Sequence, residues 1–280
     1  MRFTIIGCGR MGSWFAESLA DRRADLLLLD QDRKRAVEVA ERVGGRVINS
    51  LNEVTQDSPI VLALPIGAMA EVLDRLSKSK KRRLRIVEIS SFKKPIWRKV
   101  IYARKRGHVV ASIHPLFGPG QKDDRDTITI HVGRASRAED MVVRRLLPRT
   151  TIYRMTWPEH DKAMLAALSF THFIGISSAH LLSRMTPVKV MTKSLEALLA
   201  LISISLLEPI EFYTGYPMAN REAIKLFKKY SDFVAEFVDT LERGRAVQHI
   251  NKAKRILSAR YDLERIYRHF YATPTRIFDY

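Results

Sequence analysis

The sequence contains a single cysteine, Cys8, among 280 residues, and this scarcity excludes two kinds of protein. One cysteine cannot build a disulfide framework, nor can it supply a cluster of thiolate metal ligands. The histidines and acidic residues also lack the spacing of a metal-ligand cluster, so we expect no metal site. A reducing compartment, the cytoplasm, is the simplest location for such a chain.

Long apolar runs are missing as well. A membrane-spanning helix needs about 20 predominantly apolar residues, and no uninterrupted run in this sequence reaches that length. The N-terminus has the pattern of a strand followed by a glycine turn, which differs from that of a signal peptide. We therefore expect no membrane segment.

Acidic residues are few compared with basic ones. The sequence has 30 Asp and Glu residues and 48 Lys and Arg residues, which gives a formal net charge of +18. A nucleic-acid binder would have such a balance, and so would an enzyme with anionic ligands. The basic residues are spread along the whole chain, and the densest run, residues 78–83, falls in an expected loop. This distribution favours a small anionic substrate and makes a nucleic-acid partner the weaker alternative.

The first dozen residues contain the most informative motif. A short apolar strand leads into Gly7-Cys8-Gly9-Arg10-Met11-Gly12, and a helix pattern follows. A glycine triplet alone is weak evidence, but here it has the strand before it and the helix after it that dinucleotide binding requires. The first glycine allows a tight turn, the second admits a pyrophosphate, and the third lets helix and strand pack closely. The predicted nucleotide contacts are Gly7, Gly9, Arg10, Met11 and Gly12.

An acidic residue ends the second predicted strand. Asp30 lies about twenty residues beyond the glycine turn, where a carboxylate accepts a hydrogen bond from the adenosine ribose. This carboxylate predicts NAD as the cofactor and disfavours NADP, because it repels a 2′-phosphate. Arg33 and Lys34 follow closely and would soften that preference. The alternative is a glycine-rich turn without a ligand, with Asp30 as a solvated strand end.

Strand and helix patterns alternate as far as residue 154, which predicts an α/β fold with a Rossmann-type, doubly wound, mostly parallel sheet. Ligands of such sheets bind beyond the carboxyl ends of the strands. Leu64 ends a predicted strand, and Pro65, Ser91 and His114 each lie just past one, so we expect them at one edge, facing the cofactor. Taken singly, Pro65 could stop a strand, Ser91 could cap a helix, and His114 could be an ordinary loop residue.

The strand pattern fades after Trp157, and residues 155–280 are predicted to form an all-helical domain that follows the nucleotide-binding domain of residues 1–154. The helix expected from Lys162 to Leu182 is apolar nearly all round. Such a helix is buried in a bundle or between subunits. We therefore expect a homodimer built on the helical domain.

Several segments, in this order and at this approximate spacing, resemble prephenate dehydrogenase of tyrosine biosynthesis. They are the glycine motif, Leu64-Pro65-Ile66, Ser91-Phe92-Lys93, His114-Pro115-Leu116-Phe117-Gly118-Pro119, Glu159-His160-Asp161 and His172-Phe173. The resemblance implies NAD-dependent oxidative decarboxylation of prephenate to 4-hydroxyphenylpyruvate. It further implies that His114 accepts the proton of the ring hydroxyl, that Ser91 orients this histidine, and that His172 helps to hold the substrate.

The chain departs from this family in one respect. Members carry an arginine on a helix of the second domain that grips a substrate carboxylate, whereas residues 201–208 here are apolar and contain none. This departure leaves prephenate and arogenate both open as substrates. The candidate substitutes are Arg184 and Arg221, with Lys189 and Lys193 as further possibilities. His160 and Asp161 are interpreted as helix-start residues, and His172 alone would more often be a core histidine.

Two other functions remain as alternatives. One is a 3-hydroxyacid dehydrogenase or imine reductase of the same architecture, in which Lys162 would serve as the helix lysine; the segment after His114 speaks against it. The other is a non-enzymatic regulator that binds NAD or nucleic acid, suggested by the positive charge.

Overall fold

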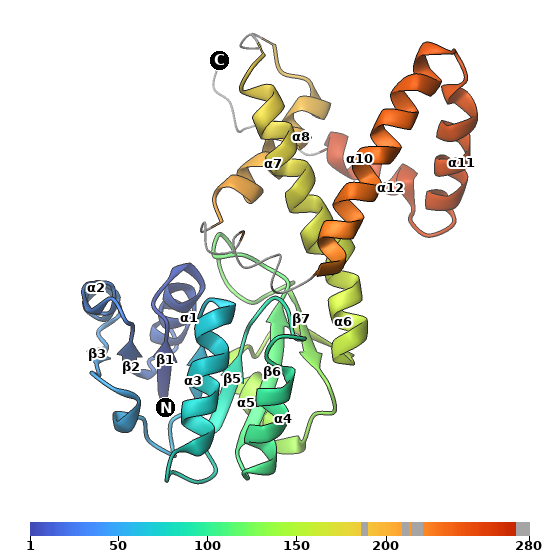
Figure 1. Ribbon diagram of the computed structural model, residues 1–280. Helices are drawn as coiled ribbons and strands as arrows, with labels where there is room; N and C mark the ends of the chain where they lie inside the picture. Colours follow the sequence, from blue (N-terminus) through green and yellow to red (C-terminus); the bar gives the residue numbers. More distant parts are fainter. Residues whose placement is uncertain (186–189, 209–212, 214–220, 273–280) are drawn as a thin grey trace. The chain divides into compact units, whose positions relative to one another are not determined.

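The computed structural model describes residues 1–185, 190–208, 213 and 221–272 (Figure 1). The chain divides into two compact units. The first is built on Met1–Met164, and the second on the described residues of 165–210 and 221–280. The division lies beyond Met155, where the strand pattern of the sequence ends, because the helix that starts at Trp157 gives its first part to the first unit.

The first unit contains an eight-stranded sheet with the order β3-β2-β1-β4-β5-β6-β7-β8. Neighbouring strands run parallel except for β6 and β7, which are antiparallel. This topology confirms the expected Rossmann-type sheet. The strands are β1 (Arg2–Ile6), β2 (Asp25–Leu29), β3 (Arg46–Val47), β4 (Ile60–Leu62), β5 (Arg85–Glu88), β6 (Val109–Pro115), β7 (Ile128–Val132) and β8 (Thr151–Met155).

Helices cover both faces of this sheet because successive strand residues point to opposite sides. Phe3 and Ile5 of β1 pack in one apolar cluster with α1, α2 and α5, whereas Ile6 packs in a second cluster with α3 and α4. The helices of the unit are α1 (Arg10–Ala20), α2 (Arg33–Val43), the short 3₁₀ helix η1 (Leu51–Glu53), α3 (Ile66–Lys78), α4 (Trp97–Lys105), α5 (Arg137–Leu146) and α6 (Trp157–Met164).

The strand order reverses between β1 and β4, and this reversal sets the location of the site. Chain connections leave β1 and β4 toward opposite sides of the sheet, so a crevice opens beyond their carboxyl ends. The glycine turn follows β1, and Leu64-Pro65 follows β4, at this point. The carboxyl ends of β5 and β6 lie further along the same edge.

The second unit is helical throughout its described residues, which confirms the helical C-terminal region. It consists of the π-helical segment η2 (Leu165–Phe170), α7 (Thr171–Leu182), α8 (Lys193–Leu206), α10 (Arg221–Glu242), α11 (Ala246–Ser258) and α12 (Leu263–Ala272). Helices α7 and α8 approach closely where Gly175 meets Ser205, since a Cβ at 175 would lie 2.1 Å from the serine Oγ. Phe173 of α7 stacks on Phe227 of α10 with ring centroids 4.2 Å apart.

The helix from Trp157 to Leu182 corrects one expectation from the sequence. By length and composition it is apolar enough to cross a membrane, and 17% of its most apolar window is buried in the single chain. Isolated polar residues interrupt the apolar runs of this helix, so the expectation based on uninterrupted runs did not include it. One such helix among the described residues is weak evidence for a membrane, because core helices of soluble proteins pass the same test.

Candidate active site

The glycine turn after β1 has the geometry of a phosphate cradle. Gly7 adopts φ +95°, and a Cβ there would lie 2.2 Å from the Ala63 carbonyl oxygen. A Cβ at Gly12 would lie 1.8 Å from the Gly7 carbonyl oxygen. At Gly9, by contrast, an added Cβ would meet no atom within 4 Å. Packing of the chain therefore requires the first and third glycines, whereas the second leaves open space where a pyrophosphate would approach.

The start of α1 presents backbone N–H donors to such an anion. Gly9 is the N-cap and has no side chain to satisfy the first backbone N–H groups, and no acid lies in the first turn. An uncapped helix start presents these N–H groups and a partial positive charge. Arg10 is exposed. The Met11 side chain packs partly against the core, so its predicted contact with the nucleotide would be made by its backbone N–H group. These residues fit a dinucleotide phosphate.

Asp30 holds the glycine turn in place, a role that the sequence did not reveal. Its Oδ2 accepts from the Cys8 backbone N–H at 2.6 Å, and its Oδ1 accepts from the Asp32 N–H at 2.8 Å. The side chain remains partly exposed. The nearby Arg33 donates to the Asn49 side chain. The carboxylate is thus fixed by the backbone before any ribose binds.

Three predicted contacts, Leu64, Pro65 and Ser91, lie just past the ends of strands, as expected. The Leu64 side chain lies beside the glycine turn, 2.9 Å from a Cβ built at Gly7, and Pro65 precedes the first turn of α3. Ser91 is half-buried in the loop after β5. Within the described parts of the chain, the Ser91 side chain makes no hydrogen bond, so the structure does not join it to His114 in that way.

His114 is buried within β6, with 7% of its surface exposed. The strand extends past the predicted end because the antiparallel β7 continues the ladder and pairs Ile130 with His114. Burial lowers the pKa of His114 well below 6.5, and the nearby His160 and Lys93 lower it further. The imidazole is therefore neutral at physiological pH, the state that a proton acceptor requires.

His160 and Asp161 are more than the helix-start residues that the sequence suggested. His160 Nε2 lies 3.0 Å from His114 Nδ1, and His160 Nδ1 lies 2.8 Å from Asp161 Oδ1. Asp161 also accepts the backbone N–H groups of Lys93 and Lys94, at 2.9 and 2.8 Å. The start of α6 is thereby joined to the loop after β5 and to the histidine of β6. The Glu-His-Asp segment was the sequence signal for this arrangement.

A buried ion pair links the loop after β5 to strands β5 and β6. Lys93 Nζ lies 2.8 Å from Glu88 Oε1, and neither side chain has any exposed surface. Lys93 Nζ also donates to the carbonyl oxygen of Ile113 at 2.7 Å, next to His114. Burial lowers the pKa of Lys93, while the charge of Glu88 opposes that shift. Sequence reasoning missed this pair, although an acid inside the apolar strand 84–89 was a signal for it.

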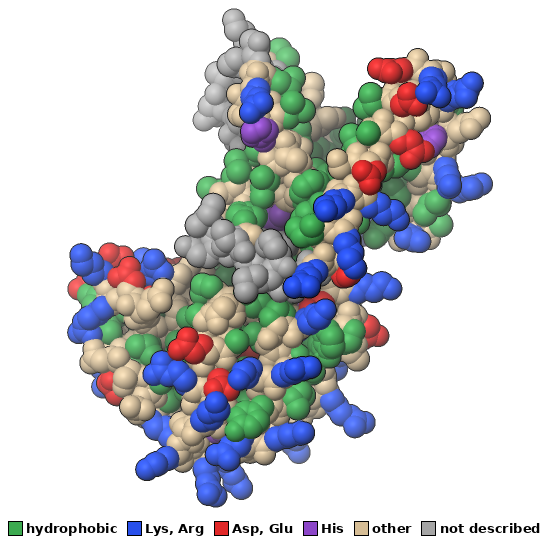
Figure 2. All heavy atoms as spheres, in the orientation of Figure 1, with side chains coloured by type: hydrophobic (Ala, Val, Ile, Leu, Met, Phe, Trp, Pro, Cys, Tyr) green, Lys and Arg blue, Asp and Glu red, His purple; other side chains and the backbone are tan. Residues whose placement is uncertain are grey.

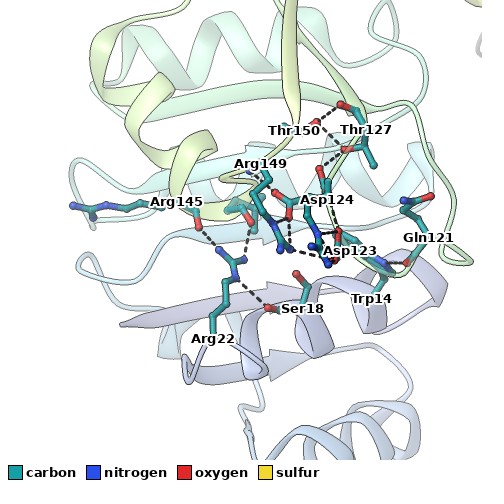
Figure 3. A network of polar contacts seen from close by, with 12 residues as sticks. Trp14, Ser18, Arg22, Gln121, Asp123, Asp124, Thr127, Arg145, Arg149 and Thr150 are labelled. Atoms are coloured by element: carbon teal, nitrogen blue, oxygen red, sulfur yellow. Dashed lines mark hydrogen bonds and ion pairs between the residues drawn. The ribbon is translucent and has the colours of Figure 1, made fainter.

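The segment that follows His114 is held against α1 by the polar network drawn in Figure 3. Trp14 Nε1 donates to the Gln121 carbonyl oxygen at 2.6 Å, and its ring packs on Phe117 at 4.8 Å. Further along, Arg149 lies 2.9 Å from Asp124 Oδ1. The loop after His114 and the helix after the glycine turn are thus fixed relative to each other within the first unit.

The predicted substrate-binding residues lie in the second unit. His172 is buried in α7, and its Nδ1 donates to the Leu168 carbonyl oxygen at 2.8 Å. Arg184 lies just after α7 and Arg221 begins α10, and both are exposed. Lys193 forms an ion pair with Glu196 at 3.0 Å, whereas Lys189 lies outside the described residues. Within the described residues, no group of three His, Cys, Asp or Glu side chains could hold a metal ion.

A doubly wound sheet, an uncapped helix after a glycine turn and an acid at the end of β2 define a dinucleotide-binding domain of the Rossmann type. Residues 15–128 match the family described as "Prephenate dehydrogenase, nucleotide-binding domain". The resemblance to prephenate dehydrogenases that the sequence motifs indicated is therefore confirmed.

Similar proteins agree with this match. The chain is 25% identical over 116 residues to the "Probable arogenate/prephenate dehydrogenase" of Methanocaldococcus jannaschii. That alignment spans 41% of this chain and only 26% of the relative.

Two solved structures share the fold at 15% identity. Prephenate dehydrogenase from Aquifex aeolicus, in complex with hydroxyphenyl propionate and NAD⁺, superposes with a TM-score of 0.72 over 92% of this chain and 98% of that one. Synechocystis arogenate dehydrogenase gives a TM-score of 0.64 over 93% and 99%. At this identity the likeness concerns the fold alone.

Proposed function

We propose that this protein is a NAD-dependent dehydrogenase that converts prephenate to 4-hydroxyphenylpyruvate and CO₂ in tyrosine biosynthesis. The single observation that carries the proposal is His114, a buried neutral histidine placed by β6 on the sheet edge that also carries the glycine turn. The names of the similar proteins support the substrate class. Arogenate is the second candidate, because the curated relative and one fold neighbour carry that substrate in their names.

The proposed chemistry assigns one proton transfer to the chain. As the ring hydroxyl of the substrate is oxidised, its O–H bond breaks and an N–H bond forms at the imidazole of His114. A base in this role typically contributes ~10²–10⁴-fold to the rate. The nicotinamide cofactor, when bound, supplies a hydride acceptor. The ring carboxylate leaves as CO₂, its bonding electrons complete the aromatic ring, and the ring oxygen takes the same proton back from His114 to give the phenol of the product. Ser91 is proposed to orient the substrate hydroxyl relative to the histidine.

The proposal assigns the cofactor to the glycine turn and to Asp30. The open space at Gly9 and the uncapped α1 start would receive the pyrophosphate. The Asp30 carboxylate favours the free ribose hydroxyls of NAD over the 2′-phosphate of NADP. Two basic side chains, Arg33 and Lys34, follow Asp30 and would attract a 2′-phosphate. The strength of the preference for NAD over NADP therefore has to be measured.

The substrate is a small dianion, and the proposal assigns its second carboxylate to Arg184 or Arg221, with His172 as a further contact. Exposed arginines are suited to this task because the guanidinium fork matches a carboxylate. Lys193 is a weaker candidate because it is already paired with Glu196. Lys and Arg side chains are scattered over the visible surface (Figure 2), and they would raise the local concentration of anionic ligands.

We further propose that the protein acts as a homodimer in the cytoplasm. The Trp157–Leu182 helix is strongly apolar, yet only 17% of its most apolar 18-residue stretch is buried in the single chain. A second copy of the helical unit would cover this surface. Neither a membrane nor a nucleic acid is needed to explain these features.

The test is NADH or NADPH formation by the purified protein, with prephenate and arogenate offered separately and with each cofactor. We expect turnover of prephenate with NAD. His114→Asn should lose kcat by at least about 100-fold while NAD binding is retained. His249→Asn, in α11, is the matched control and should leave turnover unchanged.

Turnover of arogenate alone would move the assignment to the second candidate. Failure of both substrates in a protein that still binds NAD would contradict the proposal. Lys162→Met would then be tested with 3-hydroxyacids and cyclic imines, because the competing dehydrogenases of this architecture depend on a helix lysine.

A further inference from the structure

Three side chains form a continuous hydrogen-bonded chain that ends at the proposed proton acceptor. Asp161 contacts His160, and His160 contacts His114, at 2.8 and 3.0 Å. All three lie in the first unit, and both histidine side chains are more than nine-tenths buried. The chain has a defined direction because its two ends differ chemically.

The direction is set at Asp161. A carboxylate only accepts hydrogen bonds, and this one already accepts from the backbone N–H groups of Lys93 and Lys94. The proton between Asp161 and His160 must therefore belong to His160 Nδ1. An imidazole with its one proton on Nδ1 has Nε2 as an acceptor, and this is the form of His160 in the arrangement inferred below.

The same reasoning extends to His114. Since His160 Nε2 accepts, the proton in that hydrogen bond belongs to His114 Nδ1. The remaining nitrogen, His114 Nε2, then carries the lone pair. Among the described residues, His114 Nε2 has no hydrogen-bond partner. Unlike the two ring nitrogens of His131, it is not one of the fully buried atoms that lack a partner. The lone pair of His114 Nε2 is thus available to a proton donor other than His160 and Asp161, such as a bound substrate.

We propose that His160 and Asp161 are positioning residues that fix His114 in the tautomer whose Nε2 accepts the substrate proton. The inference rests on the proposed function for the identity of the proton donor. When Nε2 takes that proton, Nδ1 keeps its own and still donates to His160, so no hydrogen bond has to reverse. In the opposite tautomer, Nε2 would already carry a proton and could not act as a base.

The rigidity of this arrangement comes from the loop after β5. Lys93 donates its backbone N–H to Asp161 and its side-chain Nζ to the Ile113 carbonyl oxygen. One residue therefore fixes both ends of the hydrogen-bonded chain, the acid in α6 and the strand position before His114. This double attachment keeps the three side chains in register.

The direct test is ¹⁵N NMR of the full chain labelled at histidine, in the absence of substrate. The expected spectrum shows His114 with a protonated Nδ1 and an unprotonated Nε2, and His160 with a protonated Nδ1. Assignment uses His114→Gln and His160→Gln. A wild-type spectrum with the proton on His114 Nε2 would overturn the proposal.

Kinetics give a second and independent readout. His160→Leu removes the acceptor for His114 Nδ1, and we expect kcat to fall by at least about tenfold with little change in KM. His160→Gln restores an acceptor oxygen at the reach of the imidazole and should recover most of the loss. His108→Leu is the matched control: it removes another buried histidine, hydrogen-bonded to Leu84 N and near Ser77 O, and should keep wild-type kcat.

Equal kcat in the wild type and both His160 variants would contradict the inference. Lack of turnover by the wild-type protein would instead contradict the proposed function. The NMR measurement needs no substrate, so it decides the tautomer in either case.

Discussion

Gly12 lies against Gly7 so closely that a Cβ on Gly12 would be 1.8 Å from the Gly7 carbonyl oxygen, whereas one on Gly9 would meet nothing within 4 Å. The two positions therefore separate folding from ligand binding. We predict that Gly9→Ala leaves the melting temperature unchanged and weakens NAD binding by about tenfold or more, about 1.4 kcal/mol. Calorimetric titration with NAD measures the affinity.

Gly12→Ala is the matched comparison for this prediction. Backbone atoms of Gly7 cannot move aside for the new methyl group without opening the contact between helix and strand, so the variant should lose stability by about 1–3 kcal/mol. If Gly9→Ala bound NAD as tightly as the wild type, the assignment of the open space to a pyrophosphate would be wrong.

Asp30 should affect both cofactor choice and stability. In Asp30→Asn, one carboxylate oxygen becomes an NH₂ group that faces a backbone N–H, either of Cys8 or of Asp32. A lost hydrogen bond of this kind costs about 1–3 kcal/mol. We also expect the ratio of kcat/KM for NAD over NADP to fall, because the repulsion of a 2′-phosphate is removed.

Glu38→Gln controls for that experiment, since Glu38 is exposed on α2 and the change in formal charge is the same. Steady-state kinetics with both cofactors and thermal melts check the two effects. An unchanged NAD preference in Asp30→Asn would remove Asp30 from cofactor selection and leave it only its role in holding the turn.

The sequence predicted the parts of the site that depend on local order along the chain. The glycine turn was recognisable because strand, turn and helix are consecutive, and His114 because a distinctive segment surrounds it. Contacts between distant segments could not be predicted in this way. His114 and His160 are separated by 46 residues, and only the packing of α6 beside the sheet brings them together. The helix-start interpretation of His160 and Asp161 considered α6 alone and missed this contact.

The fold shows the same division between local and distant order. Alternating patterns predicted the parallel sheet and the helical second part, since each is a periodic property of a short segment. The extension of β6 through Pro115 was missed because it depends on pairing with β7. Lys93 gave no sign of being buried, because its charge is compensated by Glu88 in a neighbouring segment.

The Glu88–Lys93 pair should be a point of high sensitivity. Both charges are fully buried, so removing one leaves the other without compensation. We predict that Lys93→Met destabilises the protein by about 3–5 kcal/mol, as expected for a broken buried pair. Urea denaturation followed by circular dichroism measures the change.

The double variant Glu88→Gln with Lys93→Met provides the control for this cost. It removes both charges, so it should be more stable than Lys93→Met alone. Lys99→Met, which breaks a partly exposed pair with Asp74, should change stability by less than about 1 kcal/mol. A small effect of Lys93→Met would show that the pair is not sealed from water.

The apolar helix of the second unit should govern the oligomeric state. Leu181 at the end of α7 is 64% exposed in the single chain. If a second copy covers this region, Leu181→Glu places a charge in the interface, and we expect a shift from dimer to monomer in light scattering at micromolar concentration. Glu236→Gln on α10 is a mild exposed control. A wild-type protein that is monomeric at all concentrations would contradict the homodimer proposal.

His131 should make the protein less stable in acid. It is fully buried in β7, and burial lowers its pKa to about 4, although Asp140, 3.3 Å from Nδ1, opposes the shift. The unfolded chain, with an ordinary value near 6.5, binds a proton first as the pH falls. Stability from this group is therefore complete above about pH 6.5 and is lost progressively toward pH 4, by about 3 kcal/mol in all. The buried His108 and His114, whose pKa values are also lowered, act in the same direction.

His131→Leu isolates this contribution. We expect the free energy of unfolding of the wild type to fall between about pH 7.5 and about pH 5, and the fall to be smaller by about 2 kcal/mol in the variant. His180→Leu, at an exposed position of α7, should show the same fall as the wild type. Because the comparison is between two pH values for each protein, any loss of packing in His131→Leu cancels. An equal pH dependence in the wild type and His131→Leu would mean that this imidazole is protonated as readily in the folded chain as in the unfolded one.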